Sequence, residues 1–150
     1  MHRSNIVFIL PRDEMQLTKR IVVDTLAFYA LISSTDNFHT QARLSYERFL
    51  DWEWEIWTTS YVLLETSDLI HIRLGFEPLE TFVESISRFM QILWIEESIV
   101  SEAWKRMVTR RGQEFDLTDW TTVVAAEKLG ASIFTFNKGF RNEGIRIFPR

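Results

Sequence analysis

The chain has 150 residues, 46% of them hydrophobic and 14% aromatic, and carries a formal net charge of −4 at pH 7. This length and apolar content fit one domain with its own core and exclude an intrinsically disordered chain. No cysteine is present, which excludes disulfides, thiolate zinc sites and cysteine nucleophiles and suits a reducing cytoplasm. The acidic balance excludes a general basic surface for nucleic acid. No apolar run approaches the ~20 residues that span a bilayer, so we expect no membrane segment.

Residues 1–20 are predicted to form an N-terminal extension to a domain that spans residues 21–150. The extension holds one short apolar run, Ile6 to Leu10, which ends at Pro11. This run is shorter than the ~7 apolar residues expected in the core of a signal peptide. An extra edge strand or a dimer contact is the alternative interpretation of this segment.

From residue 21 onward, the pattern alternates between strands and helices. Short, continuously apolar runs indicate parallel strands that are buried on both faces. We expect strands at 21–24, 55–58, 91–95, 132–136 and 145–148. We expect helices at 25–32, from 36 to about 50, at 60–74, 78–89, 97–110 and 116–129. This order predicts an α/β fold, a three-layer sandwich around a central, mostly parallel five-stranded sheet.

Two of the predicted helices have apolar stripes that indicate which side faces the core. In the helix that Asp36 would cap, the inward side chains are expected to be Phe38, Ala42, Tyr46 and Phe49. In the helix at 97–110, they are expected to be Val100, Trp104, Met107 and Val108.

Three acids lie where the pattern would place inward-facing residues. Asp24 ends the first strand, Glu65 interrupts the apolar stripe of helix 60–74, and Asp119 opens the stripe of helix 116–129. Ligands bind beyond the carboxyl ends of parallel strands, so all three acids can approach one edge of the sheet. Buried carboxylates are costly and repel one another, which predicts a shared divalent cation. Oxygen ligands of this kind suit Mg²⁺ or Mn²⁺, and unrelated salt bridges or caps are the alternative.

Two further residues are ambiguous as metal ligands. Asp116 lies three residues before Asp119, the spacing of an N-cap residue and an acid at N3, and capping is favoured over ligation. Asn137 follows the fourth strand, where its amide oxygen could bind metal or simply form a turn before Gly139.

Other side chains are candidates for contacts with a polynucleotide. Four basic residues across the expected cleft could hold phosphates: Arg110, Arg111, Lys138 and Arg141. Trp120 or Phe140 could stack a base, although packing is the favoured role for each. His39 could touch substrate, although a surface position without a role is favoured.

Four motifs stand in a recognisable order along the chain. They are Ile21-Val22-Val23-Asp24, the Asp36-Asn37-Phe38-His39 segment, the run Thr58 to Glu65, and Phe115 to Asp119 followed by Phe134 to Phe140. In this order they resemble the PIN-domain ribonucleases, and most closely the VapC-like toxins of toxin–antitoxin pairs. The resemblance covers roughly residues 21–148, and it matches Asp24, Glu65 and Asp119 to the three core acids of that family. The family commonly has an aspartate where this chain has Asn137.

The resemblance implies a metal-dependent endoribonuclease that uses Mg²⁺ or Mn²⁺ and cleaves single-stranded or structured RNA in the cytoplasm. It also implies a homodimer and a small antitoxin protein that blocks the cleft. The departure at Asn137 motivates a second hypothesis, a PIN-like RNA-binding or regulatory module with weakened catalysis. A phosphoacceptor receiver domain is disfavoured, because no second aspartate ends a middle strand.

Overall fold

The computed structural model describes residues 20–150, so the predicted N-terminal extension lies outside the described residues apart from Arg20. Five strands form one sheet in the order β3-β2-β1-β4-β5, and every neighbouring pair is parallel. The predicted α/β sandwich around a five-stranded sheet is therefore confirmed. The strands are β1 (Arg20–Val23), β2 (Glu55–Thr59), β3 (Gln91–Leu93), β4 (Ser132–Phe134) and β5 (Ile147–Phe148).

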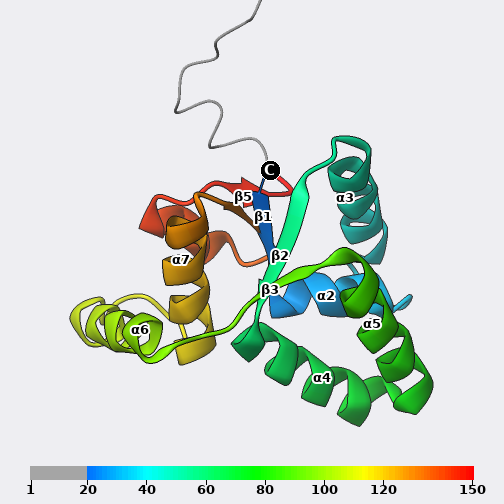
Figure 1. Cartoon of the computed structure of the whole chain (residues 1–150), viewed down its shortest axis with the longest axis horizontal. Coiled ribbons are helices and arrows are strands. Elements are labelled where there is room, and N and C mark those ends of the chain that lie inside the picture. Colours follow the sequence, from blue (N-terminus) through cyan, green and yellow to red (C-terminus); the bar gives the residue numbers. More distant parts are fainter. Residues whose placement is uncertain (1–19) are drawn as a thin grey trace, which may run out of the picture.

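Helices cover both faces of the sheet (Figure 1). One face is covered by α2 (Thr25–Ile32), α3 (His39–Asp51), α4 (Ser60–Leu74) and α5 (Phe76–Phe89). The other face is covered by α6 (Glu97–Thr109), α7 (Leu117–Leu129) and the 3₁₀ helix η1 (Lys138–Glu143). Among residues 20–150, no helix is both long and apolar enough to cross a membrane.

The central strand β1 supplies apolar side chains to both layers. Ile21 and Val23 enter the core beneath α2–α5, whereas Val22 enters the core beneath α6 and α7. This division follows from the two-residue period of a strand, which points successive side chains to opposite faces. All three side chains are fully buried, as the continuously apolar run predicts.

Two helix starts differ from their predicted positions. The carboxylate of Asp36 accepts a hydrogen bond from the backbone N–H of Phe38, so it closes a turn and the helix begins later, at His39. Gly75 ends α4 with φ of 94°, a backbone conformation that favours glycine, and α5 follows at once at Phe76 instead of at Pro78. Proline is tolerated in the first turn of a helix, where its missing N–H has no partner to lose.

The predicted inward sides are right in part for α3 and wrong for α6. In α3, Ala42 and Phe49 are buried, whereas Phe38 is exposed and stacks on Phe136. In α6, the buried residues are Ile99 and Ala103. Of the predicted inward side chains, Val100 is half-buried, whereas Trp104, Met107 and Val108 are exposed.

The orientation of α6 is explained by its contact with α7. Arg106 donates two hydrogen bonds to the carboxylate of Glu127 in α7, at 2.8 and 2.7 Å, and another to Glu102. This pairing, with the small side chain of Ala103 at the contact, turns the 99–103–106 side of α6 toward α7. The apolar stripe at 104–108 therefore points away from the core.

The aromatic core beneath α3 is centred on Phe49. Its ring lies edge-on to Phe134 and Phe148, with centroids 5.3 and 5.7 Å away, and is tilted against Trp54 at 5.4 Å. Phe49 therefore joins α3 to β4, β5 and the residue that leads into β2.

We expect Phe49→Ala to lower the free energy of unfolding by about 3–5 kcal/mol, because it removes a buried ring and leaves a cavity. Leu50→Ala, at a neighbouring exposed position of the same helix, should change it by only about 0.5 kcal/mol. Urea unfolding followed by circular dichroism measures both values. Equal losses in the two variants would show that Phe49 does not organise this part of the core.

Candidate functional site

Asp24 lies at the carboxyl end of β1, where the strand turns into α2. Its backbone N–H donates to the carbonyl of Phe134, which extends the β1–β4 pairing by one residue. Its carboxylate accepts two hydrogen bonds of 2.8 Å, from the backbone N–H of Thr25 and from the hydroxyl of Thr135. Asp24 therefore caps α2 and is fixed at the edge of the sheet while being almost fully buried.

Burial raises the pKa of Asp24 to about 6, because desolvation penalises the charged carboxylate. The two hydrogen bonds oppose this shift, and the nearby negative charges of Glu65 and Asp116 add to it. The surroundings of Asp24 thus bring its pKa close to neutral pH. That combination of burial and neighbouring like charges is typical of functional carboxylates.

Thr135 is a site residue that sequence reasoning missed. It follows β4, is buried, and its hydroxyl both donates to Asp24 and accepts from the backbone N–H of Asn137, at 3.0 Å. The available signal was a threonine near the end of an apolar strand, at the same edge of a parallel sheet as Asp24. The side chain of Thr135 fixes the orientation of the Asp24 carboxylate.

Asp116 and Asp119 form a reciprocal capping box at the start of α7. Asp116 accepts a hydrogen bond from the N–H of Asp119 at 2.8 Å, and Asp119 accepts one from the N–H of Asp116 at 3.0 Å. The predicted capping role of Asp116 is confirmed. The pKa of Asp119 is raised well above its ordinary value, first by desolvation and then by the negative charges of Asp24 and Asp116.

Glu65 lies in the second turn of α4, between the buried residues Val62 and Thr66, and its own side chain is half-buried. Its charge contributes to the raised pKa of Asp24, so the two carboxylates share one electrostatic neighbourhood. The structure therefore brings all four acids, Asp24, Glu65, Asp116 and Asp119, into mutual electrostatic contact, either directly or through Asp24.

The chemistry of these donors fits a hard divalent cation. All are carboxylates, and a cation placed among them would remove the repulsion that raises the pKa of Asp24 and Asp119. As the side chains are oriented here, no group of three or more His, Asp or Glu residues within 20–150 converges closely enough to hold a metal ion. Ligation by Asp119 would compete with the hydrogen bond that it accepts in the capping box.

Asn137 begins η1 and acts as a turn residue. Its side-chain oxygen accepts a hydrogen bond of 2.9 Å from the backbone N–H of Gly139. A side chain at Gly139 would come within 3.0 Å of this oxygen and 3.1 Å of the Phe115 ring, which explains why the smallest residue stands there. The turn is linked to Asp24 through Thr135.

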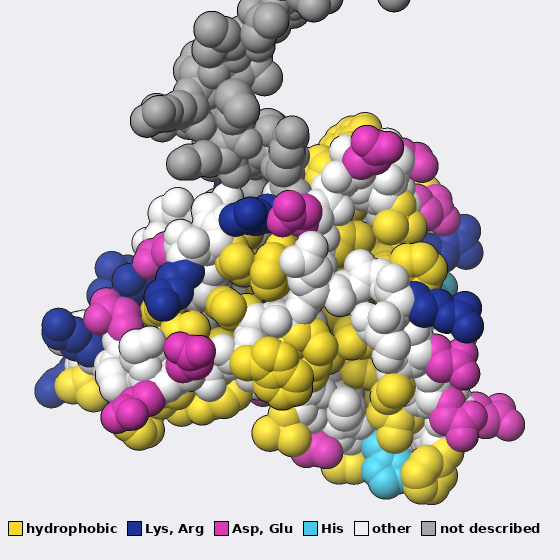
Figure 2. All heavy atoms as spheres, in the orientation of Figure 1, with side chains coloured by type: hydrophobic (Ala, Val, Ile, Leu, Met, Phe, Trp, Pro, Cys, Tyr) yellow, Lys and Arg dark blue, Asp and Glu magenta, His cyan; other side chains and the backbone are white. Residues whose placement is uncertain are grey.

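The four candidate basic residues differ in their surroundings. Lys138 and Arg141 line a hollow of about 330 Å³ whose wall includes Thr135. Arg110 instead forms an ion pair of 2.7 Å with Glu143 at the end of η1, and Arg111 is exposed. Lys138 and Arg141 thus share a hollow with Thr135, the residue that donates to Asp24, whereas Arg110 is paired with an acid. On the face shown in Figure 2, acidic and basic side chains are interspersed.

The other sequence candidates have structural roles. Trp120 and Phe140 are fully buried and pack around Phe115, so neither presents a face to a base. The Nδ1 atom of His39 lies 2.8 Å from the carbonyl oxygen of Ala30, which ties the start of α3 to α2. These positions confirm that packing is the role of both aromatic residues.

The family model for the PIN domain matches residues 21–144. The chain therefore belongs to the PIN domain family, as its motifs indicate. A comparison with curated proteins gave no significant match.

Solved structures show the same fold. VapC20 from Mycobacterium tuberculosis, described as a toxin that cleaves the sarcin–ricin loop, is similar with a TM-score of 0.74 at 23% identity, covering 83% of this chain and 95% of that chain. VapBC2 from Rickettsia felis bound to a promoter DNA fragment gives 0.66 at 14% identity, covering 85% of this chain and 96% of that chain. DNA-bound VapBC from Salmonella typhimurium gives 0.63 at 20% identity, covering 86% of this chain and 96% of that chain.

The raised pKa values predict that the metal-free protein loses stability as the pH rises. A carboxyl group whose pKa is higher in the folded chain than its ordinary value of 3.8 binds protons more tightly when folded. Its stabilising contribution is therefore complete below pH 4 and is lost as the pH passes through about 6 for Asp24, and at higher pH for Asp119.

We expect Asp24→Asn to increase the free energy of unfolding at pH 8, in the absence of divalent ions, by on the order of 1–3 kcal/mol. The amide oxygen can still accept from the backbone N–H of Thr25, and the amide nitrogen can donate to the Thr135 hydroxyl, so the first hydrogen bond is retained and the second is reversed in direction. Thermal unfolding between pH 5.5 and 8.5 should show a smaller slope for this variant than for the wild type. Asp68→Asn, at an exposed acid of α4, is the control and should leave the slope unchanged.

Proposed function

We propose that the protein is a divalent-metal-dependent endoribonuclease that cleaves single-stranded or structured RNA, and that it is the toxin of a toxin–antitoxin pair. The observation that carries the proposal is the buried carboxylate of Asp24, held at the carboxyl edge of a PIN-domain sheet among three other acids. Structural likeness to VapC20, a toxin that cleaves the sarcin–ricin loop, supports RNA as the substrate. A cytoplasmic location follows from this proposal.

Asp24, Glu65 and Asp119 would hold the cation, Mg²⁺ or Mn²⁺, with Asp116 and Asn137 as further candidates beside them. When bound, the cation supplies Lewis-acid activation of a water molecule and of the phosphodiester, with charge stabilisation at the leaving oxygen. Thr135 holds the Asp24 carboxylate in one orientation through its hydroxyl. Lys138 and Arg141 would bind phosphate groups that flank the cut.

The proposed partners are a second copy of the chain and a small antitoxin protein. The structurally similar VapBC proteins from Salmonella typhimurium and Rickettsia felis support the antitoxin, because they are toxin–antitoxin complexes. A second candidate function is an RNA-binding module without turnover. The neutral side chain of Asn137 favours it, because that side chain brings no charge to the proposed metal site.

Asp24→Asn should reduce RNA cleavage to the background rate, because it removes charge from the most deeply buried ligand. A fluorescent RNA substrate with Mn²⁺ measures the rate, and Asp68→Asn should cleave as the wild type does.

Double variants that combine Asp24→Asn with Glu65→Gln or Asp119→Asn should lose little more activity than Asp24→Asn alone, since the effects of residues that act as one unit are not additive. Induced expression should arrest growth with the wild type and not with Asp24→Asn. Cleavage at the wild-type rate by Asp24→Asn would remove this residue from the mechanism.

Asn137→Asp should tighten the binding of Mn²⁺ by roughly one order of magnitude. An aspartate can keep the hydrogen bond from Gly139 while adding a negative charge beside the metal. A charge-assisted contact contributes about 1.5–3 kcal/mol. Since about 1.4 kcal/mol corresponds to a tenfold change in affinity, the gain amounts to roughly one order of magnitude. Calorimetric titration of the metal measures the change, and cleavage at limiting Mn²⁺ should rise with it. If neither changes, Asn137 is only a turn residue, and its difference from the family has no functional meaning.

A further inference from the structure

Two adjoining hollows form a groove that begins beside the acidic site. The smaller hollow, of about 330 Å³, has Thr135, Phe136, Lys138 and Arg141 in its wall. The larger, of about 580 Å³, lies between α3 and the residues at and after β5. Gln41, Pro149 and Arg150 line both hollows, so the two adjoin each other. We call them together the α3–β5 groove. Its smaller end touches the threonine whose hydroxyl binds Asp24.

The α3–β5 groove is a basic strip on an acidic chain. Five cationic side chains line it, and no aspartate or glutamate does. None of the five forms an ion pair within residues 20–150, in contrast to Arg20, Arg43, Arg106 and Arg110. The five are Arg48, Lys138, Arg141, Arg146 and Arg150. An unpaired basic strip attracts a polyanion, even though the whole chain carries a net charge of −4.

Aromatic rings lie at the end of the groove away from Asp24. Trp52 is 57% exposed, and its ring centroid is 6.3 Å from that of Trp54. Glu53, between them, has φ of 56°, the left-handed conformation that is rare outside glycine. Phe148 lies 5.4 Å from Trp54.

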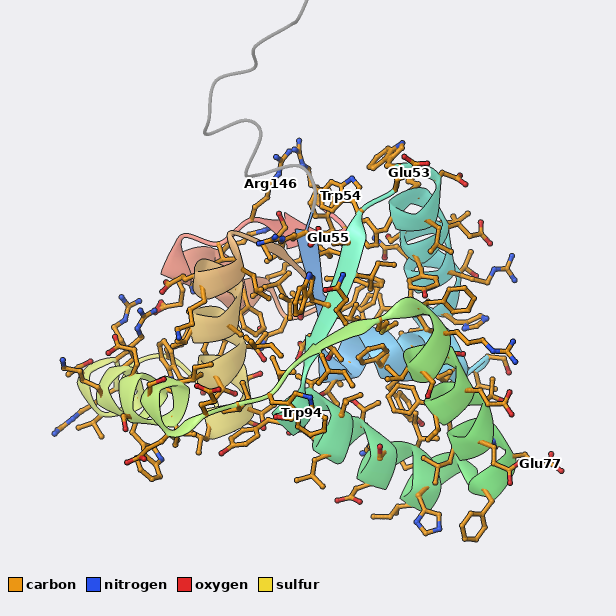
Figure 3. All side chains as sticks on the ribbon, viewed as in Figure 1. Glu53, Trp54, Glu55, Glu77, Trp94 and Arg146 are labelled. Carbon is orange, nitrogen blue, oxygen red and sulfur yellow. The ribbon has the colours of Figure 1, made fainter. Side chains whose placement is uncertain are left out.

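Guanidinium groups accompany these rings. Those of Arg146 and Arg150 lie 5.4 and 6.0 Å from the centre of the Phe148 ring. Figure 3 shows Arg146 and Trp54 close together on this side of the molecule, and Trp94 far from both. Of the two indoles, that of Trp52 is exposed, whereas that of Trp54 is half-buried against Phe49 and Phe148. An exposed indole beside arginines that have no ion pair among residues 20–150 is a combination that binds the bases and phosphates of a single strand.

We propose that the α3–β5 groove binds an unpaired stretch of the RNA substrate, with a base stacked on Trp52 and phosphates held by Arg48, Arg146 and Arg150. The proposal rests on the proposed function, because it assigns to the same acidic site a substrate that continues as a single strand away from the cut. It defines the substrate class as RNA with several unpaired nucleotides on one side of the cleaved bond. A continuous duplex hides its base faces and cannot stack on the indole of Trp52.

Binding is measured by fluorescence anisotropy with a labelled oligouridine, on protein that carries Asp24→Asn so that the RNA stays intact. Adding Trp52→Ala should weaken binding roughly 5- to 100-fold, the cost of losing one stacked base. Adding Arg146→Gln should weaken binding and lower the slope of log affinity against log salt by about one, because one phosphate contact is lost. Double-stranded RNA should bind equally to Trp52→Ala and to its parent.

The matched controls are Trp94→Ala and Arg88→Gln. Trp94 is 67% exposed after β3, and Arg88 is an exposed residue of α5, so each repeats the chemical change outside the groove. Both should bind oligouridine within about twofold of the parent, a difference of about 0.4 kcal/mol. Melting temperatures of all four variants confirm that they are folded.

The outcomes separate this proposal from the proposed nuclease function. If the wild type cleaves RNA but Trp52→Ala and Arg146→Gln bind as tightly as the controls, the groove proposal is overturned and the nuclease stands. If the wild type does not cleave while both groove variants lose oligouridine binding, the nuclease falls and the groove stands. If polyglutamate, but not oligouridine, binds the groove and loses affinity in both variants, the occupant is an acidic peptide and the RNA proposal is overturned.

Discussion

The hydrogen bond from Thr135 to Asp24 is the contact on which the rest of the site depends. It joins the carboxyl ends of two neighbouring parallel strands, and it fixes a carboxylate that is buried and surrounded by like charges. The same threonine hydroxyl accepts from the backbone N–H of Asn137, so the turn into η1 is linked to the acid through Thr135. One buried hydroxyl thus relates the acidic site, the 3₁₀ helix and the start of the α3–β5 groove.

Local sequence signals were sufficient for most of the fold. The limits of three helices, α2, α4 and α7, were predicted within about one residue, and they lie at the end of the apolar run of β1, at the cap residues Thr59 and Asp116, and at the glycines 75 and 130. These signals act over a few residues, through hydrogen bonds to free backbone groups and through allowed backbone angles. Asp24, the acid closing the first strand, was predicted for the same reason, because the end of a parallel strand is readable from its apolar run.

The features that sequence reasoning missed depend on contacts between distant segments. The side of α6 that faces α7 carries Ile99, Ala103 and Arg106, and Arg106 pairs with Glu127, 21 residues away, whereas the apolar stripe at 104–108 pointed to the opposite interpretation. The part played by Thr135 requires β4 to lie beside β1, 111 residues away along the chain. The groove combines α3 with residues at and after β5, so no single run of sequence displays its five basic side chains together.

That separation of 111 residues also has a consequence for synthesis of the protein. Asp24 is made early, but the strand that holds it in place is β4, and the far wall of the groove follows at β5. Until those segments leave the ribosome, the carboxylate has no Thr135 to orient it and the groove has no second side. Non-local contacts of this kind form only after a long loop has closed. A growing chain therefore carries Asp24 before the contact that orients its carboxylate can form. Under the proposed function, the chain would not cleave the RNA around it while it is still being translated.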